Sequence, residues 1–386
     1  MRILICGVSS ALGGMERRIE AETKLLTSLG HEVLVASSKF PELESWKSDI
    51  EKAGGRYINW RPYKFIERMQ FAAPFRWLAL STLPALKREK IDFAHIALPW
   101  NFVGISMAYV LSVAGIPFVI GVHCKLGQKK ELPGHARHFV TMALSKLIAV
   151  YGVSEPVSDS FDRLYSGLLP VNTTIDSIQN GIDVSRFAAN AQIRIELRQR
   201  LGLEATHFAV IFCGRINQMK RPLLAVKAFA QFALQYPDAR LLVVGDGAEM
   251  ALLKAEVSAQ CLAEKVIFAG QVPDTSPYYA ASDCYLSTSK NEEGYSLATA
   301  EALASGLTAV VPNDDVFDAV YGQCLAVSRC SPADSAAYAA ALLSFALCDH
   351  AQRQDYSQSA MQFANTHLST ELMDRKLTEF YKKNLY

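Results

Sequence analysis

The sequence predicts an α/β protein made of two doubly wound domains in series. The chain has 386 residues, which favours two domains of about 150–200 residues each over one small domain. Half of the residues are hydrophobic, enough to build large cores. Apolar runs of strand length alternate with helical patterns along the whole chain, which is typical of parallel sheets covered on both faces.

In the first half, apolar runs predict strands at residues 2–9, 31–37, 92–97, 118–123 and 146–154, and the segment 177–183 closes the series. Residues 15–29 predict a helix that Gly30 ends. Its expected inward side chains are Met15, Ile19, Leu25, Leu26 and Leu29.

Residues 187–204 predict a helical connector, after which a second series begins. Its strands are expected at residues 207–215, 239–247, 265–272, 283–289 and 307–313. We therefore expect an N-terminal Rossmann-like domain over residues 1–188 and a C-terminal one over 189–368, facing each other across a cleft at the carboxyl ends of their strands.

The last segment, 369–386, predicts an amphipathic helix that packs back toward the N-terminal domain. Its apolar side chains are Leu372, Met373, Leu377, Phe380 and Tyr381.

Charge and cysteine usage predict a cytoplasmic protein that binds no nucleic acid. The net charge is +1, and the eight cysteines are scattered singly without metal-ligand spacing, which favours thiols in a reducing compartment. The N-terminus is expected to be a first strand, because it lacks a signal-peptide cleavage site. Residues 93–124 contain no Asp, Glu, Lys or Arg and are long enough to span a bilayer. Pro99, Gly104, Gly115 and Pro117 interrupt them, so a buried helix that leads into a central strand is the preferred interpretation.

The stretch "NEEGYSLATAEALASG", residues 291–306, places Glu293 before a predicted helix and Glu301 inside it. Ser296 is the expected N-cap and Gly306 the expected C′ residue. If both carboxylates were helical they would stand about 12 Å apart along the axis, whereas a retaining glycosidase pair needs about 5–5.5 Å. The favoured alternative is a diphosphate at the N–H groups near Tyr295, Ser296 and Leu297, with a carboxylate on each side to accept sugar hydroxyls.

Two cations follow the predicted strand 207–215. Arg215 ends "CGR" and Lys220 comes five residues later, and such a pair can neutralise a diphosphate leaving group. Solvation in a loop, without a ligand, is the structural alternative for both cations. "VVGDGAEM" has Met250 where a dinucleotide fingerprint has its third glycine, so we do not expect a nicotinamide cofactor.

Together these residues resemble family 4 of the retaining glycosyltransferases, which have the GT-B architecture. The matching pieces are "GG" at 13–14, "GVH" at 121–123, "VS" at 153–154, "QNGID" at 179–183, "GR" with Lys220, "VVGDG", "VIFAGQV" and "EEGYSLATAEALASG". They span nearly the whole chain, and the E-x7-E segment is the most specific of them.

The resemblance implies roles for individual residues. Glu293 would hold hydroxyls of the donor sugar and Glu301 those of the ribose, while Arg215 and Lys220 would bind the diphosphate. It places His123 beside the donor sugar, although a histidine buried in a core is the structural alternative. It also implies that Gly13 and Gly14 lie close to the phosphate and the acceptor. The expected donor-binding positions further include Val272 and the helix-start residues Tyr295, Ser296 and Leu297.

The chain departs from the family pattern after the segment. Thr308 stands where the family often has proline, and "PNDDVFDAVYG" stands where paired glycines and a glutamate are frequent. No base preference is therefore carried over. Asp314 and Asp315 suggest a metal motif, but we expect a turn there, because transferases that resemble this chain need no bound metal. His135 and His138 are spaced for a metal without an apparent third ligand, and a solvated loop is expected.

A basic, aromatic-rich stretch lies between Lys52 and Lys90. Nine cations face only Glu67 and Glu89, and six aromatic side chains are interleaved: Trp60, Tyr63, Phe65, Phe71, Phe75 and Trp77. Such a stretch can sit on an anionic bilayer, line a cleft for single-stranded nucleic acid, or form a solvated helix face. The first and last interpretations are weighted equally.

The sequence thus predicts a cytoplasmic retaining hexosyltransferase that needs no metal or other cofactor. It would move a sugar from a nucleotide diphosphate sugar to a glycan or lipid-linked acceptor, with possible peripheral membrane attachment. His123, Glu293, Arg215 and Lys220 are the expected catalytic residues. The alternatives are a sugar-nucleotide epimerase of related fold and a nucleotide-sugar-binding protein without turnover.

Overall fold

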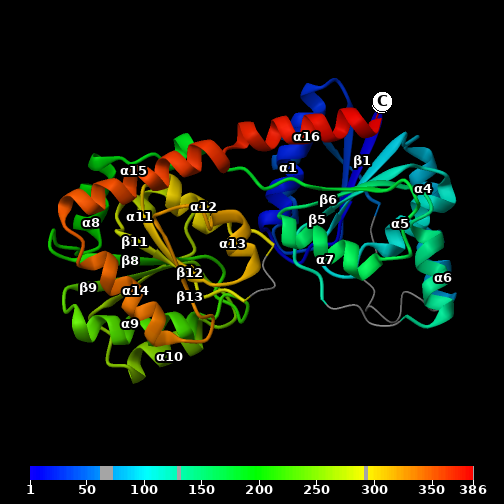
Figure 1. Ribbon diagram of the computed structural model, residues 1–386. Coiled ribbons are helices and arrows are strands. Elements are labelled where there is room, and N and C mark those ends of the chain that lie inside the picture. Colours follow the sequence, from blue (N-terminus) through cyan, green and yellow to red (C-terminus); the bar gives the residue numbers. More distant parts are fainter. Residues whose placement is uncertain (61–72, 128–131, 291–293, 386) are drawn as a thin grey trace. The chain divides into compact units, whose positions relative to one another are not determined.

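The computed structural model describes residues 1–60, 73–127, 132–290 and 294–385. It divides into two compact units. Unit 1 contains Met1–Asn180 and Met373–Tyr386, and unit 2 contains Gly181–Leu372. Figure 1 draws helices on both faces of the sheet in each unit, the arrangement that parallel sheets require because their crossover connections cover both sides.

In the described part of unit 1, the sheet has seven parallel strands in the order β3-β2-β1-β4-β5-β6-β7. The strands are β1 Arg2–Gly7, β2 Glu32–Ser37, β3 Arg56–Tyr57, β4 Phe93–Leu98, β5 Phe118–Val122, β6 Leu147–Gly152 and β7 Thr174–Ser177. The helices are α1 Gly14–Ser28, α2 Leu43–Lys52, α3 Ala73–Leu80, α4 Leu83–Arg88, α5 Ile105–Ala114, α6 Gly134–Ala143 and α7 Glu155–Tyr165, joined by α16 Thr370–Leu385.

The described part of unit 2 repeats this plan with six parallel strands in the order β10-β9-β8-β11-β12-β13. The strands are β8 Phe208–Cys213, β9 Ala239–Val244, β10 Val266–Gly270, β11 Cys284–Leu286, β12 Thr308–Pro312 and β13 Val327–Cys330. The helices are η2 Val184–Phe187, α8 Ala191–Arg200, α9 Pro222–Gln235, α10 Met250–Ala259, α11 Ser276–Ala280, α12 Leu297–Ala304, α13 Asp315–Tyr321, α14 Ser335–Ala346 and α15 His350–His367.

The division between the units lies at Asn180, whereas the sequence predicted residue 188. The reason is a pair of backbone hydrogen bonds, from Ile182 N–H to Leu368 C=O (2.9 Å) and from Thr370 N–H to Ile182 C=O (3.0 Å). These bonds place the chain beyond Gly181 in unit 2. Gly181 itself permits the approach, since an added Cβ would stand 2.6 Å from the Thr370 backbone.

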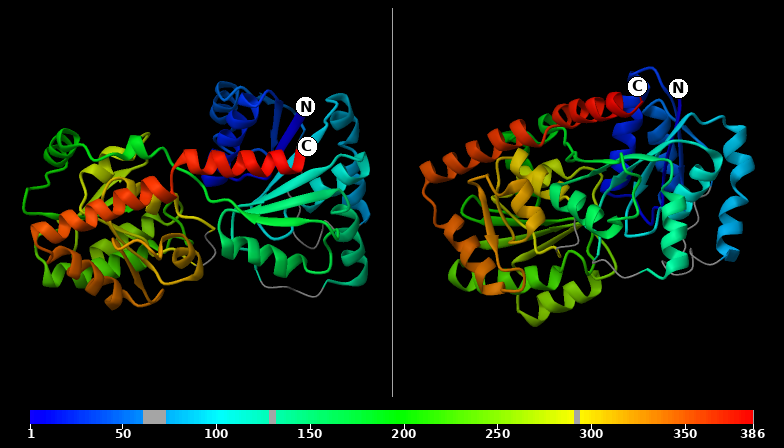
Figure 2. Two further views of the ribbon diagram at one scale, coloured as in Figure 1. Left: turned by 45° about the horizontal axis from the view of Figure 1, so that its top comes forward. Right: turned by 45° about the vertical axis from the view of Figure 1, so that its right-hand side comes forward.

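The last helix, α16, belongs to the core of unit 1. Its buried side chains Met373, Leu377, Phe380 and Tyr381 join the cluster built on Ile3, Ile5 and Val35. Figure 2 shows this helix, in red, running along unit 1 to the C-terminus. Leu372, predicted on the apolar side, is only half-buried.

Several sequence expectations need correction. The strand expected at 177–183 is β7 at Thr174–Ser177, and the short strands β3 and β13 were not predicted. Leu29, expected to face inward, is the C-cap of α1 and is 37% exposed. Residues 93–124 form β4, α5 and β5, all largely buried. Within the described stretches, no helix combines the length and apolar character that crossing a bilayer requires.

Candidate active site

In unit 2, the predicted cations follow β8, and the predicted anion-binding helix follows its neighbour β11. The chain order reverses between these two strands, because β8 pairs with β9 on one side and with β11 on the other. Ligands of doubly wound sheets bind at the carboxyl ends of strands where such a reversal occurs. The sheet order therefore brings these two sequence segments to one place.

Arg215 and Lys220 both lie beside the end of β8. Gly214 follows the strand with a φ of 141°, and a Cβ added to it would stand 3.7 Å from Cε of Lys220. The lysine side chain therefore turns back toward the strand end, where the exposed Arg215 is the next residue. The two cations predicted to bind a diphosphate share this edge.

The glycines of "VVGDG" allow the loops after β8 and β9 to pack together. A Cβ at Gly245 (φ 129°) would stand 2.0 Å from Gly214 O, and one at Gly247 would stand 2.4 Å from Ile216 O. Backbone hydrogen bonds join the same loops, from Gly214 N–H to Val244 C=O and from Ile216 N–H to Asp246 C=O. This close approach explains a G-x-G without a dinucleotide fingerprint.

The start of α12 has the predicted cap. The Ser296 hydroxyl accepts a hydrogen bond from Thr299 N–H (3.4 Å), and Tyr321 donates to the Ser296 carbonyl (2.6 Å). Tyr295 and Ser296 are buried, and Leu297, the first helical residue, is half-buried. Gly306 ends the helix in the expected left-handed conformation (φ 77°). The N-terminus of α12 is thus capped by Ser296 and held by Tyr321, and its position after β11 suits an anion.

Glu301 carries a strongly perturbed carboxyl group. It is half-buried as a residue, and burial of the carboxyl raises its pKa to about 7, against the opposing effects of Tyr279 and Arg186. Asp274, which forms an ion pair with Arg186 (2.8 Å), also raises this pKa. Hydrogen bonds donated by ligand hydroxyls would favour the ionised form of this carboxyl and lower its pKa.

We expect nucleoside diphosphate binding to strengthen as the pH rises through 7. The free carboxyl of Glu301 is mostly protonated below its pKa of about 7, and the ribose hydroxyls that the sequence prediction assigns to it would donate hydrogen bonds to the ionised form. Calorimetry at pH 6 and pH 8 should show affinity about tenfold higher at pH 8.

Glu301→Gln is the matched control, since the phosphates titrate in both proteins but the carboxyl titrates only in the wild type. The same pH dependence in the two proteins would remove Glu301 from the binding site.

In unit 1, the predicted residues also follow strand ends. Gly13 is the N-cap of α1, and Gly14 is its first residue, after β1. His123 follows β5 and is 8% exposed. Burial, with the nearby Arg18 guanidinium, lowers the pKa of His123 to about 3, so the ring is neutral at physiological pH. Its Nε2 has no hydrogen-bond partner among the described residues.

A buried polar cluster in unit 1 was missed by sequence reasoning. The Glu22 carboxylate accepts hydrogen bonds from Arg18 (2.6 Å), Tyr381 (2.8 Å) and Tyr151, and lies 2.7 Å from Nδ1 of His95. His95 and Arg18 hold the pKa of Glu22 far below its usual value, against the effect of burial. The cluster ties α1, β4, β6 and α16 together, and its members are too far apart in sequence to form a recognisable motif.

The remaining predicted positions are placed as follows. Glu293 lies outside the described residues. Val272 lies, half-buried, in the loop after β10. Asp314 is the N-cap of α13, accepting from Phe317 N–H (2.9 Å), and Asp315 is its first residue. The expected turn is thus a helix start.

His135 and His138 are exposed on α6, not in a loop. In the part of the chain that the structure covers, no group of three or more His, Cys, Asp or Glu side chains could hold a metal ion.

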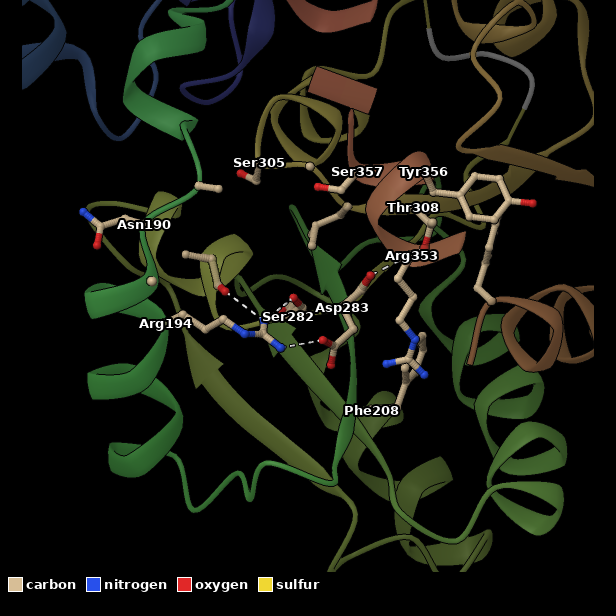
Figure 3. Close-up of a pocket in the computed structure, with 16 residues that line it drawn as sticks. Asn190, Arg194, Phe208, Ser282, Asp283, Ser305, Thr308, Arg353, Tyr356 and Ser357 are labelled. Carbon is tan, nitrogen blue, oxygen red and sulfur yellow. Dashed lines mark hydrogen bonds and ion pairs between the residues drawn. The ribbon is translucent and has the colours of Figure 1, made fainter. Parts of the chain in front are cut away.

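A cavity of about 320 Å³ lies at the amino ends of the strands in the same sheet, opposite the carboxyl ends described above. Phe208 and Thr308 line it where β8 and β12 begin (Figure 3). Its charged groups are used within the fold: Arg194 donates to Ser282 C=O (2.7 Å) and to Asp283 (2.6 Å), and Arg353 donates to Ala346 C=O (2.6 Å). None of the predicted site residues lines it, so we regard it as a structural cavity.

Comparison with known protein families gives two matches that together cover most of the chain. A model described as "Glycosyltransferase Family 4" matches residues 12–186, and one described as "Glycosyl transferases group 1" matches residues 193–363. The chain is 26% identical over 382 residues to phosphatidyl-myo-inositol mannosyltransferase of Mycolicibacterium smegmatis, covering 94% of this chain and 89% of that protein. It is 23% identical over 338 residues to alpha-monoglucosyldiacylglycerol synthase of Acholeplasma laidlawii, covering 82% and 79%.

Among solved structures, the fold is similar to that of Anabaena Alr3699/HepE in complex with UDP. The TM-score is 0.80 and the identity 18%, and the match covers 99% of this chain and 100% of that chain.

Two parallel-sheet Rossmann-like units, each matched by a glycosyltransferase family model, define a glycosyltransferase of the GT-B type. Since the two models together cover almost all of the sequence, the chain belongs to glycosyltransferase family 4.

Proposed function

We propose that this protein is a retaining hexosyltransferase that uses a nucleotide diphosphate sugar and a glycan or glycolipid acceptor. The observation that carries the proposal is the meeting of three elements at the ends of β8 and β11: the Arg215–Lys220 pair, the capped start of α12, and the Glu301 carboxyl. Cations and a helix N-terminus suit a diphosphate, and a carboxylate suits ribose hydroxyls. The solved structure with UDP, from a protein of the same fold, supports this donor class.

The proposed chemistry rests on positioning and on stabilising the departing diphosphate. Arg215 and Lys220 would neutralise the charge that develops on the leaving group, and the acceptor would attack on the face from which the diphosphate departs. A diphosphate oxygen would take the acceptor's proton. His123, neutral because of its low pKa, would offer a ring nitrogen to a sugar hydroxyl.

A lipid-linked acceptor is supported by the names of the two curated relatives, one a phosphatidyl-myo-inositol mannosyltransferase and the other a glucosyldiacylglycerol synthase. Synthesis of a cell-surface glycolipid or polysaccharide on the cytoplasmic membrane face is the corresponding role.

The first test is a panel of UDP-, GDP- and ADP-sugars ranked by thermal shift, followed by assays with diacylglycerol and phosphatidylinositol acceptors. We expect free nucleoside diphosphate only when an acceptor is present, and a product with the donor's anomeric configuration by NMR. An epimerase would convert the donor without an acceptor, and a binding protein would bind without turnover. Inversion of the anomeric centre would contradict the retaining mechanism.

Transfer is expected to persist in excess EDTA, because the cations of the protein take the place of a metal at the diphosphate. Initial rates with and without chelator give the measurement. If EDTA abolishes activity and Mg²⁺ or Mn²⁺ restores it, the metal-independent mechanism is contradicted. Asp314 and Asp315 would then be the candidate metal ligands.

Membrane attachment through the basic stretch is the part of the proposal that rests on unit 1. Lys87, Arg88 and Lys90 are exposed at the end of α4, and Trp77 on α3 is 74% exposed. Other members of the stretch are engaged within the fold: Arg56 pairs with Glu89 (2.8 Å), and Trp60 is buried. Arg61, Lys64, Arg68 and four of the aromatic residues lie outside the described side chains.

Replacing Lys87, Arg88 and Lys90 with glutamine should therefore move the protein from anionic vesicles into the unbound fraction in a sedimentation assay. Each cation near an anionic surface contributes about 1 kcal/mol, and high salt should release the wild type by screening. Turnover with a short water-soluble acceptor should survive the change.

The control replaces Arg200, Lys227 and Lys254, which are exposed in unit 2, and removes the same net charge. Equal vesicle binding by the wild type and the Lys87, Arg88 and Lys90 variant would contradict membrane attachment here and support the alternative, a solvated helix end.

A further inference from the structure

Arg221, directly after Lys220, has a backbone conformation that arginine rarely adopts. Its φ of 48° and ψ of 55° are left-handed, which for a residue with a Cβ is unfavourable. The next residue, Pro222, begins α9 and further restricts the residue before it. Such strain persists only where surrounding interactions hold it, and it is concentrated at functional sites.

The Arg221 side chain supplies those interactions. Its Nε donates to the carbonyl of Thr288 (2.7 Å), and its Nη2 donates to the carbonyl of Pro332. Thr288 follows β11 and Pro332 follows β13. One planar guanidinium therefore links the loop after β8 to the loops after two other strands by hydrogen bonds. The ammonium of a lysine lacks this fork of donors.

The same loop is held from the opposite direction. The buried Thr288 hydroxyl lies 2.9 Å from the carbonyl of Lys220 and 3.0 Å from that of Arg221, and Lys290 N–H donates to Met219 C=O (2.8 Å). Lys220 N–H donates to Asn217 C=O (3.1 Å). The backbone on both sides of the Lys220 side chain is thus held in one position, from which that side chain turns back toward Gly214.

We propose that Arg221 is a positioning residue: by binding the Thr288 and Pro332 carbonyls it stabilises the left-handed turn that aims the Lys220 ammonium at the donor diphosphate. The inference rests on the proposed function, because it assigns Lys220 to the diphosphate. Arg221 acts through Lys220 and need not touch the ligand. A lysine at the end of a long flexible stem gains most from a fixed backbone, since misplacement of a charged group weakens every interaction it makes.

The test compares Arg221→Gly in the wild-type and Lys220→Ala backgrounds by calorimetry. Glycine accepts the left-handed conformation, so the turn can still form, but without its guanidinium clamp. The probes are whichever of UDP, GDP and ADP the wild type binds most tightly, and the corresponding nucleoside. Arg221→Gly should weaken diphosphate binding about tenfold in the wild-type background and less than about twofold in the Lys220→Ala background. Nucleoside affinity should stay unchanged.

Arg221→Lys separates positioning from a direct charge contact. Lysine keeps the charge but cannot bind both carbonyls, so it should restore little of the lost affinity. Full restoration by lysine would overturn the proposal in favour of a direct contact between residue 221 and the ligand. Cys261→Gly is the control for relief of left-handed strain, because Cys261 is exposed with a φ of 54°. It should leave both affinities unchanged.

Thr288→Val provides a second approach that does not alter Arg221. It removes the hydroxyl beside the Lys220 and Arg221 carbonyls, and should also weaken diphosphate binding without affecting nucleoside binding. Equal losses for Arg221→Gly in both backgrounds, or parallel losses for diphosphate and nucleoside, would show a merely structural role and overturn the inference. If Lys220→Ala itself leaves diphosphate affinity unchanged, the proposed function fails instead. If Lys220→Ala weakens binding and Arg221→Gly does not, only the inference fails.

Discussion

Glu293→Ala is expected to abolish most sugar transfer while leaving the protein folded. The resemblance to family 4 assigns Glu293 to the hydroxyls of the donor sugar, where a lost carboxylate removes interactions that orient the reacting carbon. Initial rates with saturating donor measure the loss, and thermal unfolding of the variant checks the fold.

Glu292→Ala is the matched control, since it removes the same charge one residue earlier in the sequence. A Glu293 variant that retains more than half of wild-type activity would contradict the sugar-binding role. Equal losses in the two variants would point to the total charge of this segment and not to one carboxylate.

Arg215→Ala and Lys220→Ala are each expected to weaken nucleoside diphosphate binding by about 1.5–3 kcal/mol, the range for a lost charged hydrogen bond. This corresponds to a Kd about 10-fold to 150-fold higher. Both side chains lie beside the end of β8, and neither belongs to the buried core, so the free energy of unfolding should change little. Calorimetry with the nucleoside diphosphate measures the effect.

Lys227→Ala is the control for this pair, because Lys227 is an exposed lysine on α9, the helix that follows the Lys220 loop. Unchanged affinity in both the Arg215 and the Lys220 variants would place the diphosphate elsewhere in the protein.

Local patterns in the sequence were sufficient to predict most elements of the fold. Long apolar runs such as "HFAVIFC" correspond to β8, and "SLATAEALASG" contains both the Ser296 cap and the Gly306 terminator that the structure shows. The strand predictions succeed because burial on both faces of a parallel sheet demands continuous hydrophobic strands. The helix-end predictions succeed because a helix end needs a side chain or a glycine to complete its hydrogen bonds.

Predictions of secondary structure were wrong where contacts with segments distant in sequence, and not the local pattern, decide the conformation. β3 and β13 are short edge strands, with two and four residues, and strands of this length carry too little periodicity to be recognised. The segment 177–183 was expected to close the series of strands, yet β7 ends at Ser177, and the hydrogen bonds of Ile182 to Leu368 and Thr370 join the chain from Gly181 onward to unit 2. Asp314 and Asp315 were expected in a turn and instead begin α13.

For the site, the sequence by itself determined which residue types are present and which strand each one follows. Arg215, Lys220, Ser296 and Glu301 were predicted as site residues partly on this basis, because carboxyl ends of parallel strands are where ligands bind. Only the tertiary structure decided how these groups are held and charged. The pKa of Glu301, raised to about 7, depends on burial against η2 and α11 residues, and the turn at Arg221 depends on carbonyls 67 and 111 residues further along the chain. Desolvation and long-range hydrogen bonds arise only when distant segments meet, so no local pattern contains them.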